Sequence, residues 1–172
     1  MRREESQYLG YSFEFNGGIK NVYSFQTVLG CDYNITFKPT PYLFGENAVF
    51  SYFTYEFSIV LAKNPMDKEP PVDLKIPPTI AAIFSDFFNK TFYTVVVYIC
   101  DSSDGRQIFR KRKFDRWFEY YKGDSFIKID ASFDETDGNN YPVSLILKER
   151  NPFRNEICTQ FMNIVGGFNE AK

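Results

Sequence analysis

Thr91-Phe-Tyr-Thr-Val-Val-Val-Tyr-Ile-Cys100 is the stretch that decides the fold. It joins β-branched and aromatic residues in one continuous run, without the alternation of polar and apolar residues that marks a strand with one solvent-exposed face. Such a run is typical of a strand covered on both faces. We therefore predict that residues 91–100 form the central strand of a sheet, and the rest of the chain is assigned outward from it.

A helix is predicted directly before this strand, over residues 79–89. Its apolar residues recur at i, i+3, i+4, i+7 and i+8, which places them on one helical face: Ile80, Ile83, Phe84, Phe87 and Phe88. The segment before the helix, residues 63–78, contains five prolines. Prolines lower the entropy that a long loop loses on ordering. We interpret residues 63–78 as an exposed connection inside a single domain that covers residues 1–172.

The first 60 residues predict an antiparallel meander. Apolar and polar residues alternate with period 2 over residues 11–15, 21–29, 33–37 and 49–61, which indicates four half-buried strands. Asn16-Gly17-Gly18 separates the first two strands with residues that tolerate the positive φ angles of a tight hairpin. No strand–helix–strand pattern occurs among these four strands.

Beyond the central strand, the pattern predicts a helix, a hairpin and a last helix. The helix covers residues 113–121, with Phe114, Trp117, Phe118 and Tyr121 on one face. Residues 126–133 form a strand, residues 134–140 a loop, and Val143, Leu145 and Leu147 mark the returning strand. The last helix is predicted to begin after Asn151-Pro152, a favourable cap and first position, and to end at Gly166-Gly167.

These elements follow one another in the order β-β-β-β-α-β-α-β-β-α. Runs of strands joined by hairpins, with few helices, are typical of an α+β domain. We predict an antiparallel β-sheet of about six to seven strands, with three helices on one face.

The composition excludes several classes of function. The chain of 172 residues has no histidine, which removes Ser-His-Asp and Cys-His nucleophiles and histidine metal ligands. Its three cysteines, Cys31, Cys100 and Cys158, are far apart and odd in number, which argues against zinc or disulfide frameworks. We expect them to be buried apolar side chains in a cytosolic protein. No apolar run is long enough for a membrane helix, and no secretory signal is expected at the N-terminus. We expect no cofactor and no bound metal.

The segment 101–122 is the most informative part of the chain for function. It carries seven basic and four acidic side chains, a balance of +3, whereas the other 150 residues carry 13 basic and 18 acidic, a balance of −5. Guanidinium groups bind carboxylates and phosphates through paired hydrogen bonds, and aromatic rings offer stacking faces. The candidate binding residues are Asp101, Asp104, Arg106, Arg110, Lys111, Arg112, Lys113, Arg116 and Trp117.

Each of these features also has a purely structural interpretation. A basic run is usually the solvated face of a strand and helix, which would pair the arginines here with Asp101, Asp104, Asp115 and Glu119. Asp101 and Asp104 could hold Mg²⁺ beside Arg106, but Asp-Ser-Ser-Asp-Gly is also strong turn chemistry. The acidic loop 134–140 lacks the ligand spacing of a calcium loop, so we interpret it as a hairpin turn.

The aromatic content is the remaining outlier. Phe, Tyr and Trp make up 19% of the chain, more than one core needs. Surface tyrosines are frequent at protein interfaces, because they provide contact area at low entropic cost. The side chains that we expect to be exposed are Tyr8, Tyr11, Tyr42, Phe44, Phe50, Tyr52, Phe53, Tyr120 and Tyr121.

Several motifs resemble a family of small uncharacterised bacterial proteins. They are Tyr98-Ile-Cys-Asp-Ser-Ser-Asp-Gly-Arg-Gln, Arg110-Lys-Arg-Lys-Phe with Trp117-Phe118, Tyr55-Glu-Phe-Ser-Ile and Ile76-Pro-Pro-Thr-Ile. The resemblance covers most of the chain. It implies a bacterial, cytosolic, single-domain protein and supplies no catalytic residue.

The sequence favours a non-enzymatic binding protein whose partner is another protein. A role accessory to a toxin or defence system would suit a small standalone domain. Nucleic-acid binding through residues 106–117 is the alternative, and a metal-dependent enzyme using Asp101, Asp104 and Arg106 is a second. A membrane partner is not expected, and the sequence leaves self-association into a homo-oligomer open.

Overall fold

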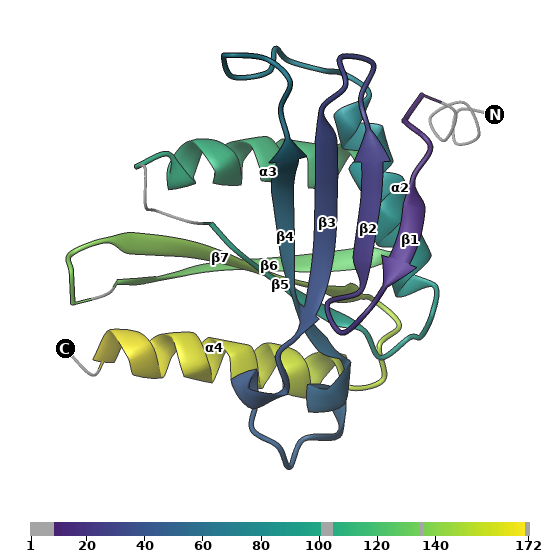
Figure 1. Cartoon of the computed structure of the whole chain (residues 1–172). Helices are drawn as coiled ribbons and strands as arrows, with labels where there is room; N and C mark the ends of the chain where they lie inside the picture. Colours follow the sequence, from purple (N-terminus) through teal and green to yellow (C-terminus); the bar gives the residue numbers. More distant parts are fainter. Residues whose placement is uncertain (1–8, 101–104, 135, 171–172) are drawn as a thin grey trace. The chain divides into compact units, whose positions relative to one another are not determined.

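The computed structural model describes residues 9–100, 105–134 and 136–170, with side chains described to residue 167 in the last helix. Figure 1 shows the order of the elements. The strands are β1 (Glu14–Gly17), β2 (Val22–Gln26), β3 (Asp32–Pro39), β4 (Thr54–Lys63), β5 (Val95–Ile99), β6 (Phe126–Asp134) and β7 (Asn140–Lys148). The helices are α2 (Ile76–Phe88), α3 (Gln107–Tyr121) and α4 (Arg154–Glu170), with short 3-10 turns η1 (Pro41–Leu43) and η2 (Val49–Phe53).

The predicted α+β class and element order are confirmed. The strands lie in the order β1-β2-β3-β4-β5-β7-β6, and the sheet is mostly antiparallel. The exception is β4, which runs parallel to β5, with Thr54 opposite Val95. Helix α2 lies between them in the chain, and a strand–helix–strand connection returns the chain in the same direction.

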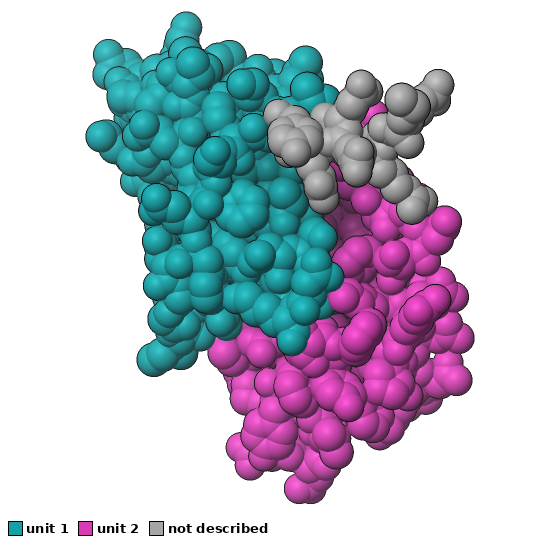
Figure 2. Space-filling view, turned by 90° about the vertical axis from the view of Figure 1, so that its right-hand side faces the viewer, with its two compact units in different colours: residues 1–38, 57–90 teal, residues 39–56, 91–172 magenta. Residues whose placement is uncertain are grey.

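The described residues cluster into two compact units. One comprises residues 1–38 and 57–90, and the other comprises residues 39–56 and 91–172 (Figure 2). The chain passes from one unit to the other at the end of β3, within β4 and after α2. The proline-rich segment, residues 63–78, lies within the first unit, and its interpretation as a connection stays a prediction. The single-domain assignment stays a prediction.

In the first unit, α2 packs its apolar face on the strands that precede it. The Phe37 and Phe87 rings stack with centroids 3.9 Å apart, and Phe84 lies edge-on to Phe37. Ile80, Ile83 and the three helix phenylalanines are buried, as the i, i+3, i+4 spacing predicts. The helix begins at Ile76, because Pro77 and Pro78 occupy its first turn, where a missing N–H costs nothing.

In the second unit, β5, β7 and β6 carry an apolar core on one face. Val95 and Val97 of β5 join Leu145 of β7 and Ile157 and Phe161 of α4 in one buried cluster. Phe44, directly after η1, and Phe50, within η2, also belong to it. The expectation that these two rings are exposed is therefore wrong: the turns fold them back over the core.

Helix α3 lies on the opposite face of the same three strands. Along β5, Val96 and Tyr98 point to the face opposite Val95 and Val97. The ring centroids of Tyr98 and of Phe114 on α3 are 4.4 Å apart. Figure 1 shows the β6–β7 hairpin between α3 and α4. The central strand is thus covered on both faces, as its apolar run predicts. The expectation that the helices lie on one face is wrong for this unit.

Several element boundaries differ from the predicted ones: β1 covers Glu14–Gly17 and not residues 11–15, α2 begins at Ile76 and not at residue 79, and β5 covers only Val95–Ile99. Helix α4 continues through Gly166-Gly167 to Glu170, because two glycines weaken a helix without stopping it. Helix α3 begins at Gln107 and not at residue 113, so the basic segment is helical. Residues 49–53 form a 3-10 turn, and the strand begins only at Thr54.

The cysteines match their expected role in two cases out of three. Cys31 and Cys100 are buried free thiols, whereas Cys158 on α4 is half-buried. Burial raises the pKa of the Cys100 thiol, which keeps it protonated and unreactive at neutral pH. Among the described residues, no helix has both the length and the apolar composition needed to cross a bilayer.

Candidate functional site

Helix α3 carries most of the predicted binding residues. Gly105 precedes it with a φ of 71°, a left-handed conformation that favours glycine and sets the entry of the chain. No proline or glycine interrupts residues 106–122, and the Gln, Arg and Lys side chains there are good helix formers. The basic residues therefore lie around a regular helix, and their spacing decides which of them face the sheet.

The inner side of α3 meets the sheet through one buried ring and one charged group. Phe114 is buried against Tyr98. One turn away, the Lys111 ammonium lies between Asp115 of its own helix and Asp130 of β6. Burial raises the pKa of the Tyr98 phenol, so this contact stays uncharged at neutral pH.

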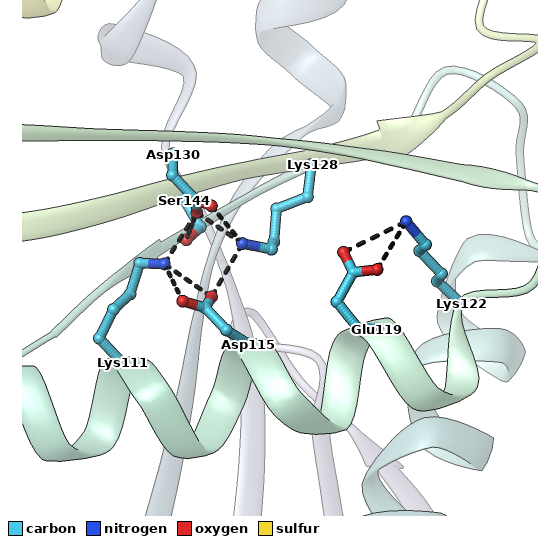
Figure 3. Close-up of polar contacts among 7 residues, drawn as sticks. All are labelled: Lys111, Asp115, Glu119, Lys122, Lys128, Asp130 and Ser144. Carbon is cyan, nitrogen blue, oxygen red and sulfur yellow. Dashed lines mark hydrogen bonds and ion pairs between the residues drawn. The ribbon is translucent and has the colours of Figure 1, made fainter.

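Lys111 belongs to an ionic cluster of five residues, Lys111, Asp115, Lys128, Asp130 and Ser144 (Figure 3). The Lys111 Nζ is 2.5 Å from Asp115 Oδ2 and 2.9 Å from Asp130 Oδ1. The Lys128 Nζ is 2.8 Å from Asp115 Oδ1 and 2.5 Å from Asp130 Oδ2. Ser144 Oγ donates to Asp130 Oδ1 at 2.7 Å. Two ammonium groups thus meet two carboxylates, and the cluster joins α3 to β6 and β7 with no net charge.

The cluster fixes the charge states of its members. Partial burial alone would raise the pKa of Asp130, but hydrogen bonds from Lys128, Lys111 and Ser144 outweigh it and lower the pKa to about 2. Burial alone would lower the pKa of Lys111, but its bonds to Asp115 and Asp130 raise it above the ordinary value. Only 6% of the Lys128 side chain is exposed. Asp130 and Lys111 are therefore ionised at neutral pH, and both lysines of the cluster are occupied by carboxylates.

The opposite side of the helix is the outer face of α3, defined by Phe109, Arg112, Lys113, Arg116 and Tyr120. These residues follow at i, i+3, i+4, i+7 and i+11, which places them on one stripe. All five are exposed, Phe109 by 74% and Tyr120 by 78%. Within the described part of the chain, the guanidinium groups of Arg112 and Arg116 have no hydrogen-bond or ion-pair partner. This face can therefore accept anionic and aromatic groups from outside.

The other predicted residues occupy different surroundings. Arg106 is exposed at the cap position before α3, and Arg110 is half-buried, where its charge acts to lower the pKa of Tyr98. Trp117 is half-buried, with the Lys113 ammonium 5.0 Å from its ring centroid. Asp101 and Asp104 lie outside the described residues.

The structural interpretation of the basic segment expected arginines as the partners of Asp115 and Glu119, and the structure gives these two carboxylates lysine partners. Asp115 pairs with Lys111 and Lys128, and Glu119 pairs with Lys122 at 2.9 Å. Lysines, including one from β6, thus stand where arginine partners were expected.

Three members of the ionic cluster were not among the predicted site residues: Lys128, Asp130 and Ser144. A signal was present, because period-2 alternation in residues 126–133 places Lys128 and Asp130 together, opposite the apolar face of Ile127 and Ile129. The pairing with Ser144 depends on the β6–β7 register, in which Asp130 lies opposite Ser144. The proximity of Lys111 needs the position of α3 as well.

The predicted exposed aromatics divide into four groups. Tyr42, Tyr52 and Tyr120 are exposed, as expected. Tyr11, Phe53 and Tyr121 are half-buried. Phe44 and Phe50 are core residues, and Tyr8 lies outside the described residues. Residues 42–53 therefore offer two exposed tyrosines and not a continuous aromatic surface.

Metal-ligating side chains do not gather in the part of the chain that the structure describes, where no three of His, Cys, Asp and Glu lie together. In the hairpin loop, Asp137 accepts hydrogen bonds from the Asn139 backbone and side chain, as in a turn.

The architecture defines the class: an α+β protein with a mostly antiparallel seven-stranded sheet. The family of unknown function DUF6169 matches residues 72–163, more than half of the chain, and the protein belongs to that family. The match includes α2, β5, α3, β6 and β7, and thus both the ionic cluster and the outer face of α3. The resemblance to an uncharacterised family is thereby confirmed. No curated protein and no solved structure matches the chain.

Proposed function

We propose that this protein is a non-enzymatic binding protein of the bacterial cytosol, and that the outer face of α3 is where it binds another protein. The observation that carries the proposal is the division of charges around one helix. Lys111 is neutralised by Asp115 and Asp130 on the inner side, whereas Arg112 and Arg116 have no partner among the described residues. A helix held by its inner charges can present its outer charges without losing its own attachment.

The composition of the outer face is that of a protein interface. Arginine and tyrosine are enriched among the residues that dominate binding energy, and lysine and glutamate are depleted. Phe109 and Tyr120 lie at the two ends of the stripe, with Arg112 and Arg116 between them. Rings supply contact area, and guanidinium groups supply paired hydrogen bonds, so the same stripe provides both affinity and orientation.

The charge of the face indicates an acidic partner. Segment 101–122 has a net charge of +3, and the rest of the chain has a net charge of −5. An acidic surface is therefore attracted to α3 and repelled by the rest of the protein. Nucleic acid carries the same sign of charge and is the alternative ligand. Exposed tyrosines beyond the basic stripe, at Tyr42 and Tyr52, fit a protein partner better than a phosphate backbone.

The test is photo-crosslinking in cells with a photoreactive amino acid at position 109, followed by mass spectrometry of the adducts. The matched control carries the same amino acid at Val72, which is also highly exposed but lies in the proline-rich connection. We expect a protein adduct from position 109, absent from position 72, that falls by about tenfold in the Arg112→Glu/Arg116→Glu double variant. A Lys63→Glu/Lys68→Glu variant, with two exposed charges reversed elsewhere, should retain the adduct.

Two results would contradict the proposal. One is an adduct whose yield is the same with and without the Arg112/Arg116 reversal. The other is tight binding of short labelled single- or double-stranded oligonucleotides that weakens steeply with salt, which is the signature of phosphate contacts. Binding of Mg²⁺ or Mn²⁺ by calorimetry, abolished by replacing Asp101 and Asp104, would favour the metal-dependent enzyme instead.

A further inference from the structure

Strand β6 lies at the end of the sheet. In the strand order, β7 is its one neighbour, and no other strand of the described residues pairs with it. It is nine residues long and contains no proline. A long edge strand without a breaker offers its free backbone groups to another strand.

The hydrogen-bond pattern identifies which backbone groups face outward. The Glu149 N–H donates to the Ser125 carbonyl at 2.9 Å, in the same register as the β6–β7 ladder. In an antiparallel pair, hydrogen-bonded and non-bonded positions alternate, so odd-numbered residues of β6 bond to β7. The N–H and C=O groups of Lys128 and Asp130 therefore point away from β7. Within the described part of the chain, no hydrogen bond reaches these groups.

The charges that would normally protect such an edge are neutralised. A lysine on an edge strand usually repels a second strand. Here the Lys128 ammonium is held by Asp115 and Asp130 and is almost fully buried. The other face of β6 carries Ile127 and Ile129, packed partly against the core of the second unit. The edge thus presents no solvent-exposed lysine and is not covered by another strand of the described chain, and its charges act only on which register a second strand can take.

We propose that β6 pairs antiparallel with β6 of a second copy of this chain, with the two-fold axis at Ile129. Only outward-facing residues can form the new hydrogen-bonded pairs, so the registers near the middle of the strand are centred on Lys128, on Asp130, on Ile129 between them, or on Ala131. The first places lysine opposite lysine and the second aspartate opposite aspartate, and both like-charge pairs are unfavourable. The register centred on Ile129 places Lys128 opposite Asp130 of the second copy on both sides of the axis. The register centred on Ala131 places Lys128 opposite Asp134 but leaves Asp130 opposite Ser132. Only the register centred on Ile129 gives both Lys128 and Asp130 an opposite charge across the axis, so charge complementarity favours it.

The pairing has a consequence for the outer face of α3. A two-fold axis through an antiparallel pair is perpendicular to the sheet, so equivalent faces of the two copies point the same way. Helix α3 lies on the face that carries Lys128 and Asp130. Two copies of its outer face would then lie on one side of the dimer. A partner with two acidic sites would bind such a pair more tightly than it binds one copy.

The test has two parts: the molecular mass of the unchanged protein in solution, and a disulfide crosslink between cysteines placed at the two-fold axis. Ile129 lies at a non-hydrogen-bonded position of the new pair, where Cα atoms are about 4.5 Å apart, within reach of a disulfide. The Ile129→Cys variant should therefore form a covalent dimer on mild oxidation. The matched control, Ala131→Cys, lies four residues from its own copy, about 13 Å along the strand, which is too far. Both variants carry Cys158→Ser, because Cys158 is only half-buried.

We expect sedimentation of the unchanged chain to show a monomer–dimer equilibrium, and Ile129→Cys to crosslink at least about tenfold faster than Ala131→Cys. Circular dichroism checks that both variants are folded. A chain that stays monomeric at roughly 100 µM overturns the proposal without reference to either variant. Faster crosslinking of Ala131→Cys overturns the register, and equal rates for the two variants show random collision and overturn the pairing.

Discussion

Helices α3 and α4 pack on opposite faces of the same three strands by different physics. Helix α4 is attached by Ile157 and Phe161, which are buried among the valines and leucines of β5 and β7. Helix α3 fully buries a single ring, Phe114, while Trp117, Phe118 and Tyr121 are only half-buried, and the ionic cluster supplies the rest of its attachment to β6 and β7. Apolar burial stabilises by about 25 cal/mol per Å², whereas a partly buried ion pair loses much of its Coulomb energy to desolvation. The comparison indicates that α4 is part of the core of its unit and that α3 is attached more weakly.

The largest effect is expected on the α4 side. Phe161→Ala removes a ring that is 2% exposed and should lower the free energy of unfolding by about 3–5 kcal/mol, measured by urea denaturation. The matched control is Met162→Ala on the same helix, where the side chain is half exposed, with an expected change below about 0.5 kcal/mol. Similar losses in the two variants would contradict apolar burial as the attachment of α4.

A smaller effect is expected on the α3 side. Asp130→Asn leaves two ammonium groups facing one carboxylate and should cost about 1–2 kcal/mol, less than a fully buried pair, because nearly half of the Asp130 side chain is exposed. Trp117, the one tryptophan of the chain, lies on α3, so its fluorescence follows the attachment of this helix. Asp124→Asn, at an exposed position just after the helix, should change stability by less than about 0.5 kcal/mol. An Asp130→Asn variant as stable as this control would show that the ionic cluster contributes nothing.

Acid should weaken the ionic cluster selectively. The cluster lowers the pKa of Asp130 to about 2, below the ordinary value of about 4, so the carboxylate stabilises the folded chain above pH 4. This contribution is lost as the pH falls through the folded pKa. We therefore expect the stability difference between the unchanged chain and Asp130→Asn to shrink by about 1 kcal/mol between pH 5 and pH 2. Urea denaturation at several pH values measures this difference, and a constant difference would contradict the assigned pKa.

The two sides of the sheet also differ in how far the sequence predicts them. The α4 side follows from local periodicity: the apolar run Val95-Val96-Val97 and the stripe of Ile157 and Phe161 predict the strand, the helix and their burial. Gly166-Gly167 did not end α4, because a stop signal is only a bias that neighbouring helical residues outweigh.

The α3 side depends on contacts between residues distant in the sequence. Asp130 meets Lys111 and Ser144 only through the strand register and the helix position, neither of which a local pattern contains. The burial of Phe44 and Phe50 has the same origin, because a 3-10 turn is too short to show a periodic pattern of apolar residues in the sequence. Local pattern thus predicted the elements and the basic segment, while tertiary contacts decided which of its charges are occupied.

The smallest expected effect concerns the outer face of α3. Arg112→Ala and Arg116→Ala remove exposed guanidinium groups that have no partner among the described residues, so each should change the free energy of unfolding by less than about 0.5 kcal/mol. Lys111→Ala, one position away on the same helix, leaves Asp115 and Asp130 short of one cation and should cost clearly more. Denaturation followed by Trp117 fluorescence compares the three variants. If Arg112→Ala is as costly as Lys111→Ala, the outer charges hold the helix in place and are not free for a partner. If Arg112→Ala leaves the free energy of unfolding unchanged, the outer arginines do not contribute to the attachment of α3 and are free to bind a partner.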